Sequence, residues 1–196
     1  MRRLRPEWTP VNLEGWFLKN FDPGISRYFR DELGLTEPEL ALELEIWRRF
    51  ATTLRPHFFP GFLEAVGAYQ QAGGLVAVAS HSEAEVIRAH YRAQDTHPRV
   101  EPDVVYGWES GEGRRKPSPW PVDDLVRKFG LSRERVLVVD DLKPGVLMAQ
   151  AARVAVAAAG WAHRLEPIER YMRENCVAYL ESVPVFQEFV LEQAGG

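Results

Sequence analysis

The chain has 196 residues, enough for one domain or for a domain with a modest insertion, and it can bury a sizeable core. Its 45% hydrophobic residues and 27% charged residues are ordinary for a soluble globular protein, and its formal net charge of −4 argues against a nucleic-acid partner. The single cysteine, Cys176, excludes an internal disulfide and fits a reducing compartment. Because no apolar run approaches membrane-spanning length, we expect a cytoplasmic protein with no membrane partner.

The first part of the chain has a helical pattern after an irregular start. Residues 1–23 contain prolines and aromatic residues without a regular period, and we expect them to be irregular. A short helix is predicted over residues 24–34. A longer helix begins at Thr36, which forms a capping box with Glu39, and extends to about residue 54. We interpret this region as a small helical insert.

From Gly61 onward, apolar strands alternate with helices. Strands are predicted over residues 75–79, 103–106, 136–139, 154–158 and 177–180, and helices over 62–72, 82–92, 118–129, 145–152, 166–175 and 183–191. Ser82 and Ser118 are the predicted N-caps of two of these helices. Strands separated by helices of this length form βαβ units with right-handed crossovers. The sequence therefore predicts an α/β fold with a parallel sheet.

Two adjacent carboxylates follow the predicted strand 136–139. Asp140 and Asp141 lie at the carboxyl end of this strand, where open α/β sheets bind their ligands. Neighbouring carboxylates repel each other unless a cation lies between them, and a hard divalent metal prefers oxygen ligands. In the alternative interpretation, one aspartate caps the following helix and the other is solvated.

Two further polar residues are predicted at the same edge of the sheet. Ser80 follows the strand 75–79, and Lys116 leads into the helix 118–129. Each has an ordinary explanation by itself, as a helix N-cap for Ser80 and as a solvated side chain for Lys116. A hydroxyl, a cation and a carboxylate pair at one edge instead favour an anionic substrate, most simply a phosphate ester.

These segments resemble motifs II, III and IV of the haloacid dehalogenase (HAD) superfamily. The matching strings are Val76-Ala-Val-Ala-Ser80, Lys116-Pro117-Ser-Pro119 and Val136-Leu-Val-Val-Asp140-Asp141. The resemblance implies a three-layer α/β/α, Rossmann-like core over residues 56–196 and a small, incomplete helical cap over residues 1–55. It also implies a Mg²⁺-dependent phosphatase that acts on a small phosphate monoester.

The resemblance assigns a role to each matching residue. Ser80 would hydrogen-bond the phosphate, and His81 would line the site and contribute its backbone N–H. Lys116 would bind the substrate and balance its negative charge. Asp140 and Asp141 would hold Mg²⁺.

The first motif of the superfamily, an apolar strand that ends in Asp-x-Asp-Gly-Thr, does not occur in this sequence. Its first aspartate is the nucleophile in the family. The nearest string is Asn12-Leu13-Glu14-Gly15, and the uncharged amide of Asn12 cannot accept a phosphoryl group in this way. Because Pro10 disfavours a central strand, we expect the chain to begin inside the cap, with the first strand upstream. A decayed first motif at Asn12 is the alternative.

The expected function is therefore hydrolysis of a small phosphorylated metabolite, with a chain that is inactive as given. The alternative is a phosphate-binding or regulatory module without turnover. Dehalogenation fits less well because it does not need an acidic metal pair. Trp161 and His163 follow the strand 154–158 and are candidates for the rim of the pocket, whereas residues 111–115 form a basic loop. Exposed aromatic residues between 7 and 59 are compatible with an oligomer.

Overall fold

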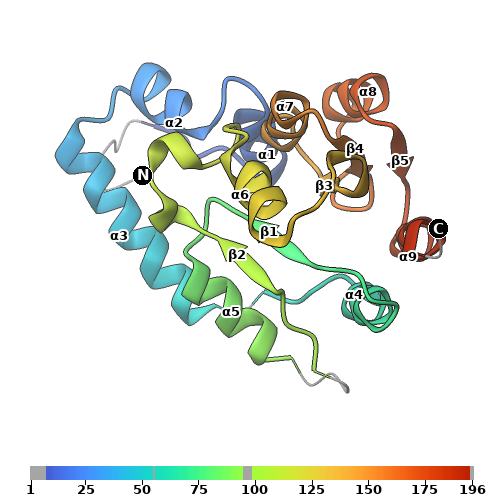
Figure 1. Ribbon diagram of the computed structural model, residues 1–196. Helices are drawn as coiled ribbons and strands as arrows, with labels where there is room; N and C mark the ends of the chain where they lie inside the picture. The colour runs from blue at the N-terminus through green and yellow to red at the C-terminus, as the bar shows by residue number, and fades with distance from the viewer. Residues whose placement is uncertain (1–7, 55, 95–98, 195–196) are drawn as a thin grey trace. The chain divides into compact units, whose positions relative to one another are not determined.

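The computed structural model describes residues 8–54, 56–94 and 99–194 (Figure 1). The chain divides into two compact units, Met1–Arg55 and Pro56–Gly196. Among the described residues, none of the helices is both long enough and apolar enough to cross a membrane.

The first unit is helical throughout its described part. Its elements are α1 (Leu13–Phe21), α2 (Ile25–Arg27), the π-helical turn η1 (Tyr28–Glu32) and α3 (Glu37–Thr53). The prediction that residues 1–23 are irregular is wrong for α1, where Asn12 is the N-cap and its side-chain oxygen accepts a hydrogen bond from the Gly15 N–H at 2.8 Å. A strand that ends at Asn12, as a decayed first motif would require, is therefore also wrong. Residues 1–7 lie outside the described residues.

A small aromatic and aliphatic core holds this unit together. Tyr28, Phe29, Leu33 and Leu35 are buried against one another, with Ile25 and Leu40 packed on them. The predicted capping box at Thr36 and Glu39 is confirmed, because the backbone N–H of Thr36 donates to the Glu39 carboxylate at 2.9 Å.

The second unit alternates strands and helices, as predicted. Its elements are α4 (Phe62–Gln71), β1 (Ala77–Ala79), α5 (Ala84–Arg92), β2 (Val104–Tyr106), the 3₁₀ turns η2 (Trp108–Ser110) and η3 (Glu112–Arg114), α6 (Trp120–Phe129), the 3₁₀ turn η4 (Arg133–Arg135), β3 (Leu137–Asp140), α7 (Lys143–Ala152), β4 (Ala155–Ala159), α8 (Glu166–Asn175), β5 (Ala178–Leu180) and α9 (Val183–Ala194). These bounds lie within a few residues of the predicted ones, which confirms the α/β class.

All strand pairs in this unit are parallel, but they form two sheets. β1 pairs with β2, and β4 lies between β3 and β5. Within the described part of the chain, the second edges of β1 and of β3 therefore have no strand partner. Ala77 in β1 is exposed, and Val78 and Val139 are only half-buried, whereas Ala157 in β4 is fully buried. The division of the sheet thus adds two open edges, at β1 and β3, to the outer edges at β2 and β5.

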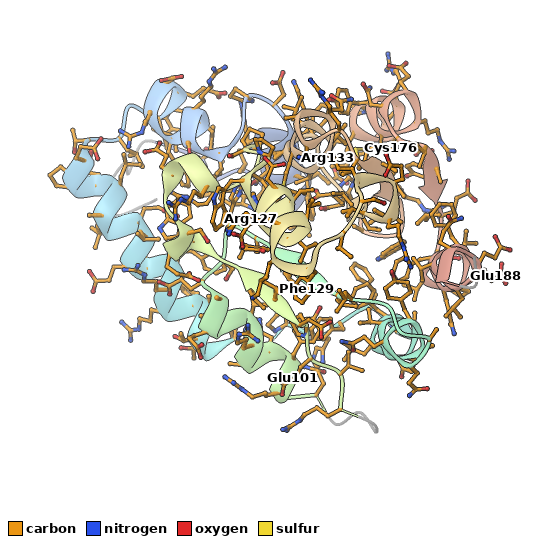
Figure 2. All side chains as sticks on the ribbon, in the orientation of Figure 1. Glu101, Arg127, Phe129, Arg133, Cys176 and Glu188 are labelled. Atoms are coloured by element: carbon orange, nitrogen blue, oxygen red, sulfur yellow. The ribbon has the colours of Figure 1, made fainter. Side chains whose placement is uncertain are left out.

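Helices cover both faces of the strands, which gives three layers. Figure 1 shows α4 beside α9, and α7 between α6 and α8. The main core joins α4, α5 and α9 to strands of both sheets, through buried residues that include Val66, Ile87, Ala157 and Phe186. On the other side, Arg133 (labelled in Figure 2) connects α6 with α7 because its guanidinium donates to the Asp123 carboxylate and to the Ala152 carbonyl.

The two predicted N-caps each lie one residue before the observed ones. The N-cap of α5 is Glu83 and that of α6 is Pro119, although the Ser118 hydroxyl accepts a hydrogen bond from the Trp120 N–H at 3.4 Å. Ser82 instead turns its carbonyl toward the loop after β2, where it accepts a hydrogen bond from the Trp108 N–H at 2.8 Å. The loops after β1 and β2 are therefore joined, which a local capping pattern does not reveal.

We expect the chain to self-associate through the open edges of β1 and β3, because unpaired strand edges pair with those of other molecules. Ala77→Lys, which adds a charge to the exposed part of β1, should shift the equilibrium toward monomer. Gln71→Lys, at the exposed end of α4, adds the same charge away from the edge and should leave the association unchanged. Sedimentation velocity over a range of concentrations measures this. A wild-type chain that stays monomeric throughout would contradict the expectation.

Candidate active site

The candidate residues gather at the carboxyl ends of β1 and β3. Ser80 and His81 follow β1 directly, and Asp140 is the last residue of β3. Lys116 lies in the loop between η3 and α6, which follows β2. The structure brings His81, Lys116 and Asp140 into a single chain of contacts, as described below.

A largely buried ion pair between Lys116 and Asp140 joins the two sheets. The Lys116 Nζ donates to the Asp140 Oδ2 at 2.6 Å, and the two side chains are only 16% and 9% exposed. The other carboxylate oxygen, Oδ1, accepts a hydrogen bond from the Leu142 N–H at 3.0 Å. Gly145 allows this placement, since a Cβ there would lie 2.1 Å from the Asp140 Cγ. Asp140 is therefore held on three sides.

The charge of Lys116 is maintained despite its burial. Burial alone would lower the pKa of Lys116, but the carboxylate of Asp140, assisted by that of Asp141, outweighs burial and raises this pKa above its ordinary value. Lys116 is thus a cation at neutral pH, and its charge is balanced before any ligand arrives.

His81 supports the backbone of Lys116. Its Nε2 lies 2.9 Å from the Lys116 carbonyl oxygen, and because a carbonyl only accepts, this nitrogen carries the proton and donates. Burial lowers the pKa of His81, and the cations of Lys116 and Arg115 add to this effect, although the bond to the carbonyl opposes it. His81 is therefore neutral at neutral pH, with one defined tautomer. The contribution of its backbone N–H to phosphate binding stays a prediction.

Ser80 is oriented by the turn after β1. Its backbone N–H donates to the Tyr106 carbonyl at 2.9 Å, which extends the pairing of β1 with β2. Its hydroxyl oxygen accepts a hydrogen bond from the Ser82 N–H at 3.0 Å. Since a hydroxyl also has a proton to donate, Ser80 can offer one hydrogen bond to a ligand.

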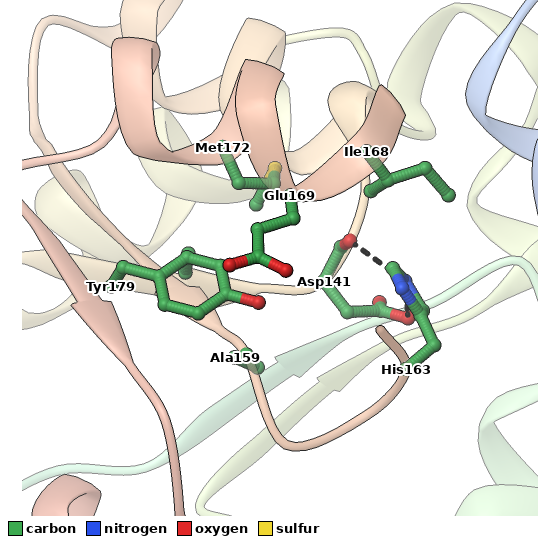
Figure 3. A pocket seen from close by; sticks show the side chains of 9 residues that line it. Asp141, Ala159, His163, Ile168, Glu169, Met172 and Tyr179 are labelled. Carbon is green, nitrogen blue, oxygen red and sulfur yellow. Dashed lines mark hydrogen bonds and ion pairs between the residues drawn. The ribbon is translucent and has the colours of Figure 1, made fainter. Parts of the chain in front are cut away.

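Asp141 faces a small, partly open pocket beside this ion pair, with a volume of only about 10 Å³ (Figure 3). The pocket is lined by Asp141, Ala158, Ala159, Gly160, His163, Ile168, Glu169, Met172 and Tyr179. The His163 Nε2 lies 3.2 Å from the Asp141 carbonyl oxygen and 3.5 Å from its Oδ2, so the ring restricts the position of Asp141. Asp141 keeps 32% of its side chain exposed.

The two aspartates thus differ in what they offer to a metal ion. Both oxygens of Asp140 already accept hydrogen bonds, whereas Asp141 presents a carboxylate that is about one-third exposed. A hard oxygen donor of this kind fits Mg²⁺, which usually takes one or two carboxylates and keeps several waters. In the part of the chain that the structure describes, no three His, Cys, Asp or Glu residues are placed to hold a metal together. Asp140 as a direct ligand stays a prediction.

The pocket includes residues that the strand-end pattern did not identify. Glu169 and Tyr179 come from α8 and β5, and nothing in their local sequence marks them. His163 lines the pocket as the position after β4 indicated. Trp161 instead packs against the core, where its ring centroid is 5.3 Å from that of Phe186.

The basic loop 111–115 follows the turn η2 and contains the turn η3. Two arginines in this loop stack on tryptophans. The Arg115 Cζ lies 3.5 Å from the ring centroid of Trp108, and the Arg114 Cζ lies 4.9 Å from that of Trp120. The spacing of these aromatic residues gave no signal of the stacking, because the turns bring them together.

The lowered pKa of His81 predicts an effect of pH on stability. The unfolded chain takes up a proton near the ordinary histidine value of 6.5, whereas the native His81 takes it up only at lower pH. Acidification below about pH 6.5 should therefore destabilise the wild type, because the unfolded state binds more protons there. His81→Gln retains an N–H donor but does not titrate, so its free energy of unfolding should fall less over the same range. Urea denaturation from pH 8 to pH 5 tests this, and parallel curves would contradict it.

A family model for haloacid dehalogenase-like hydrolases matches residues 12–153. The protein also resembles several solved structures. One is a haloacid dehalogenase-like protein of unknown function from Agrobacterium tumefaciens, with 18% identity and a TM-score of 0.71, over 98% of this chain and 88% of the other.

Two other solved structures have more specific descriptions. A candidate β-phosphoglucomutase from Thermotoga maritima is 19% identical with a TM-score of 0.61, over 98% of this chain and 88% of the other. A candidate phosphoglycolate phosphatase from Lactobacillus delbrueckii is 18% identical with a TM-score of 0.67, over 90% of this chain and 75% of the other. At these identities the likeness shows a common fold. No curated protein matches the sequence significantly.

The match of the family model covers more than half of the chain, and it includes the segments that carry Ser80, Lys116 and Asp140. The parallel α/β architecture agrees with it. This chain therefore belongs to the haloacid dehalogenase-like hydrolases.

Proposed function

We propose that this chain carries the charge-balancing part of a Mg²⁺-dependent site for small phosphate monoesters. The observation that carries the proposal is the largely buried pair of Lys116 and Asp140 at the carboxyl edge, with the partly exposed carboxylate of Asp141 beside it. A buried cation and a hard oxygen donor at one sheet edge suit a phosphoryl group, whose charge must be neutralised during transfer.

Each proposed residue has a distinct task. Lys116 attracts the phosphoryl oxygens, and Asp140 keeps it charged and in place. Ser80 donates one hydrogen bond, and His81 fixes the backbone of Lys116 through its carbonyl oxygen. These groups together bind the phosphate and hold it in one orientation.

Asp141 would hold Mg²⁺, with Asp140 as the second carboxylate. The ion, when bound, would supply further neutralisation of the phosphate charge. His163 and Glu169 line the same pocket, and His163 restricts the position of Asp141. We also propose that the helical unit Met1–Arg55 serves as the cap.

The covalent step needs an acceptor that these residues do not provide. In the family an aspartate of the Asp-x-Asp-Gly-Thr motif takes up the phosphoryl group, and this sequence has no such motif. Within the described residues, Asp140 is paired with Lys116, and Asp141 is the proposed metal ligand. The same observation favours the second candidate function, a phosphate-binding or regulatory module without turnover.

We propose a small phosphorylated metabolite as the ligand of this chain and a cytoplasmic location for the protein. Two structurally similar proteins are described as a candidate phosphoglycolate phosphatase and a candidate β-phosphoglucomutase, and both descriptions concern small phosphate esters. The net charge of −4 supports a small ligand over nucleic acid.

Mg²⁺ should bind weakly at Asp141, because one or two carboxylates leave most of its coordination to water. A titration followed through backbone amide shifts should perturb residues near Asp141 in the wild type and leave them unperturbed in Asp141→Asn. Glu188→Gln, which removes one negative charge from an exposed site on α9, should behave as the wild type does. An unchanged response in Asp141→Asn would show that the metal assignment is wrong.

The chain as given should show no turnover of p-nitrophenyl phosphate above background, with or without Mg²⁺. Acid–base assistance is typically worth only about 10²–10⁴-fold and cannot replace a covalent acceptor. A continuous absorbance assay at neutral pH, with purified chain and a buffer blank, measures this. Robust Mg²⁺-dependent turnover would overturn the binding-only account of this chain.

A further inference from the structure

We propose that Arg115, stacked on Trp108, forms a second anion-binding subsite next to Lys116, so that the ligand of this site carries a second anionic group besides its phosphate. A carboxylate and a second phosphate share the chemistry that a guanidinium recognises. The inference rests on the proposed function, in which Lys116 is the cation that binds the phosphate of the ligand.

The stacking places Arg115 at the carboxyl edge of β1 and β2. The Arg115 Cζ lies 3.5 Å from the Trp108 ring centroid, which is a face-on contact. Trp108 is itself anchored, because its backbone N–H donates to the Ser82 carbonyl in the loop after β1. The guanidinium therefore stacks on a residue whose backbone is joined to the loop that follows Ser80.

The hydrogen-bonding edge of this guanidinium remains available. Stacking uses the face of the group, whereas its five N–H donors point outward in its plane. Among the described residues, the Arg115 side chain makes no hydrogen bond or ion pair, and Glu112 is the acidic group close enough to act on it electrostatically. Burial lowers the pKa of Arg115 and Glu112 opposes this, but an arginine stays charged at neutral pH.

Arg115 also lies close to the phosphate-binding residues. Its charge lowers the pKa of His81, whose ring bonds the carbonyl of Lys116. Because Asp140 balances the charge of Lys116, Arg115 contributes a cation here that no described carboxylate pairs with. Two cations, only one of them neutralised, suit a ligand with two anionic groups.

The neighbouring Arg114 provides a matched control. It stacks on Trp120 at 4.9 Å, is exposed, and does not contribute to the shift of the His81 pKa. Replacing either arginine with glutamine removes the same charge from the same loop, but only Arg115 borders the proposed subsite.

The test compares three stable probes by isothermal titration calorimetry on the full chain. Methylphosphonate has one anionic group, phosphonoacetate adds a carboxylate, and methylenediphosphonate adds a second phosphonate. We expect the wild type to bind at least one of the two larger probes about tenfold or more tightly than methylphosphonate, as a charge-assisted hydrogen-bonded contact predicts. Arg115→Gln should abolish this preference and keep the affinity for methylphosphonate. Arg114→Gln should keep the preference, and which larger probe gains more separates a carboxylate ligand from a bisphosphate.

Equal affinity of the wild type for all three probes would overturn the subsite, as would equal losses in the two arginine variants. The phosphate site is tested separately with the double variant Lys116→Met/Asp140→Asn, which removes both buried charges together. Circular dichroism melts establish that this variant is folded. Methylphosphonate binding that survives in it would contradict the proposed function, and absence of binding to any probe by the wild type would overturn both proposals.

Discussion

The buried ion pair between Lys116 and Asp140 is the interaction on which the candidate site depends. It connects the loop after β2 to the end of β3, and so it crosses from one sheet to the other. Removing one partner from such a pair leaves an uncompensated buried charge, which typically costs about 3–5 kcal/mol. His81 adds a bond to the backbone of Lys116 from the end of β1. Three strand ends are therefore held by one charged contact and its neighbours.

The division of the strands into two sheets gives this pair its importance. The sheets share one apolar core through α4, α5 and α9, but β1 and β3 have no ladder between them in the described chain. Apolar packing is not directional. It buries the strands in the core but does not fix how their carboxyl ends align with one another. A short charged hydrogen bond is directional, so Lys116 and Asp140 can align the carboxyl ends where the backbone ladder does not.

The site combines groups that are already satisfied with groups that are still available. Asp140 and His81 form hydrogen bonds that hold Lys116 and the adjacent backbone. Asp141, in contrast, faces a pocket, and Arg115 keeps its N–H edge free of described partners. Asp140 and His81 thus fix the position of Lys116, and Asp141 and Arg115 are left to contact a ligand. Preorganised anion sites require this arrangement.

Short-range apolar periodicity and βαβ geometry were enough to predict the α/β class, the order of strands and helices, the positions of Ser80 and Asp140 at strand ends, and that of Lys116 before a helix. The roles of Asp140 as a counter-ion and of Asp141 at the pocket depend on long-range contacts, since identical neighbouring carboxylates differ only in what surrounds them. The tertiary structure also decided the division of the sheet, the pocket residues Glu169 and Tyr179, and the stacking of Arg115 on Trp108. These features depend on contacts between segments that are separated in the chain, and local patterns carry no information about such contacts.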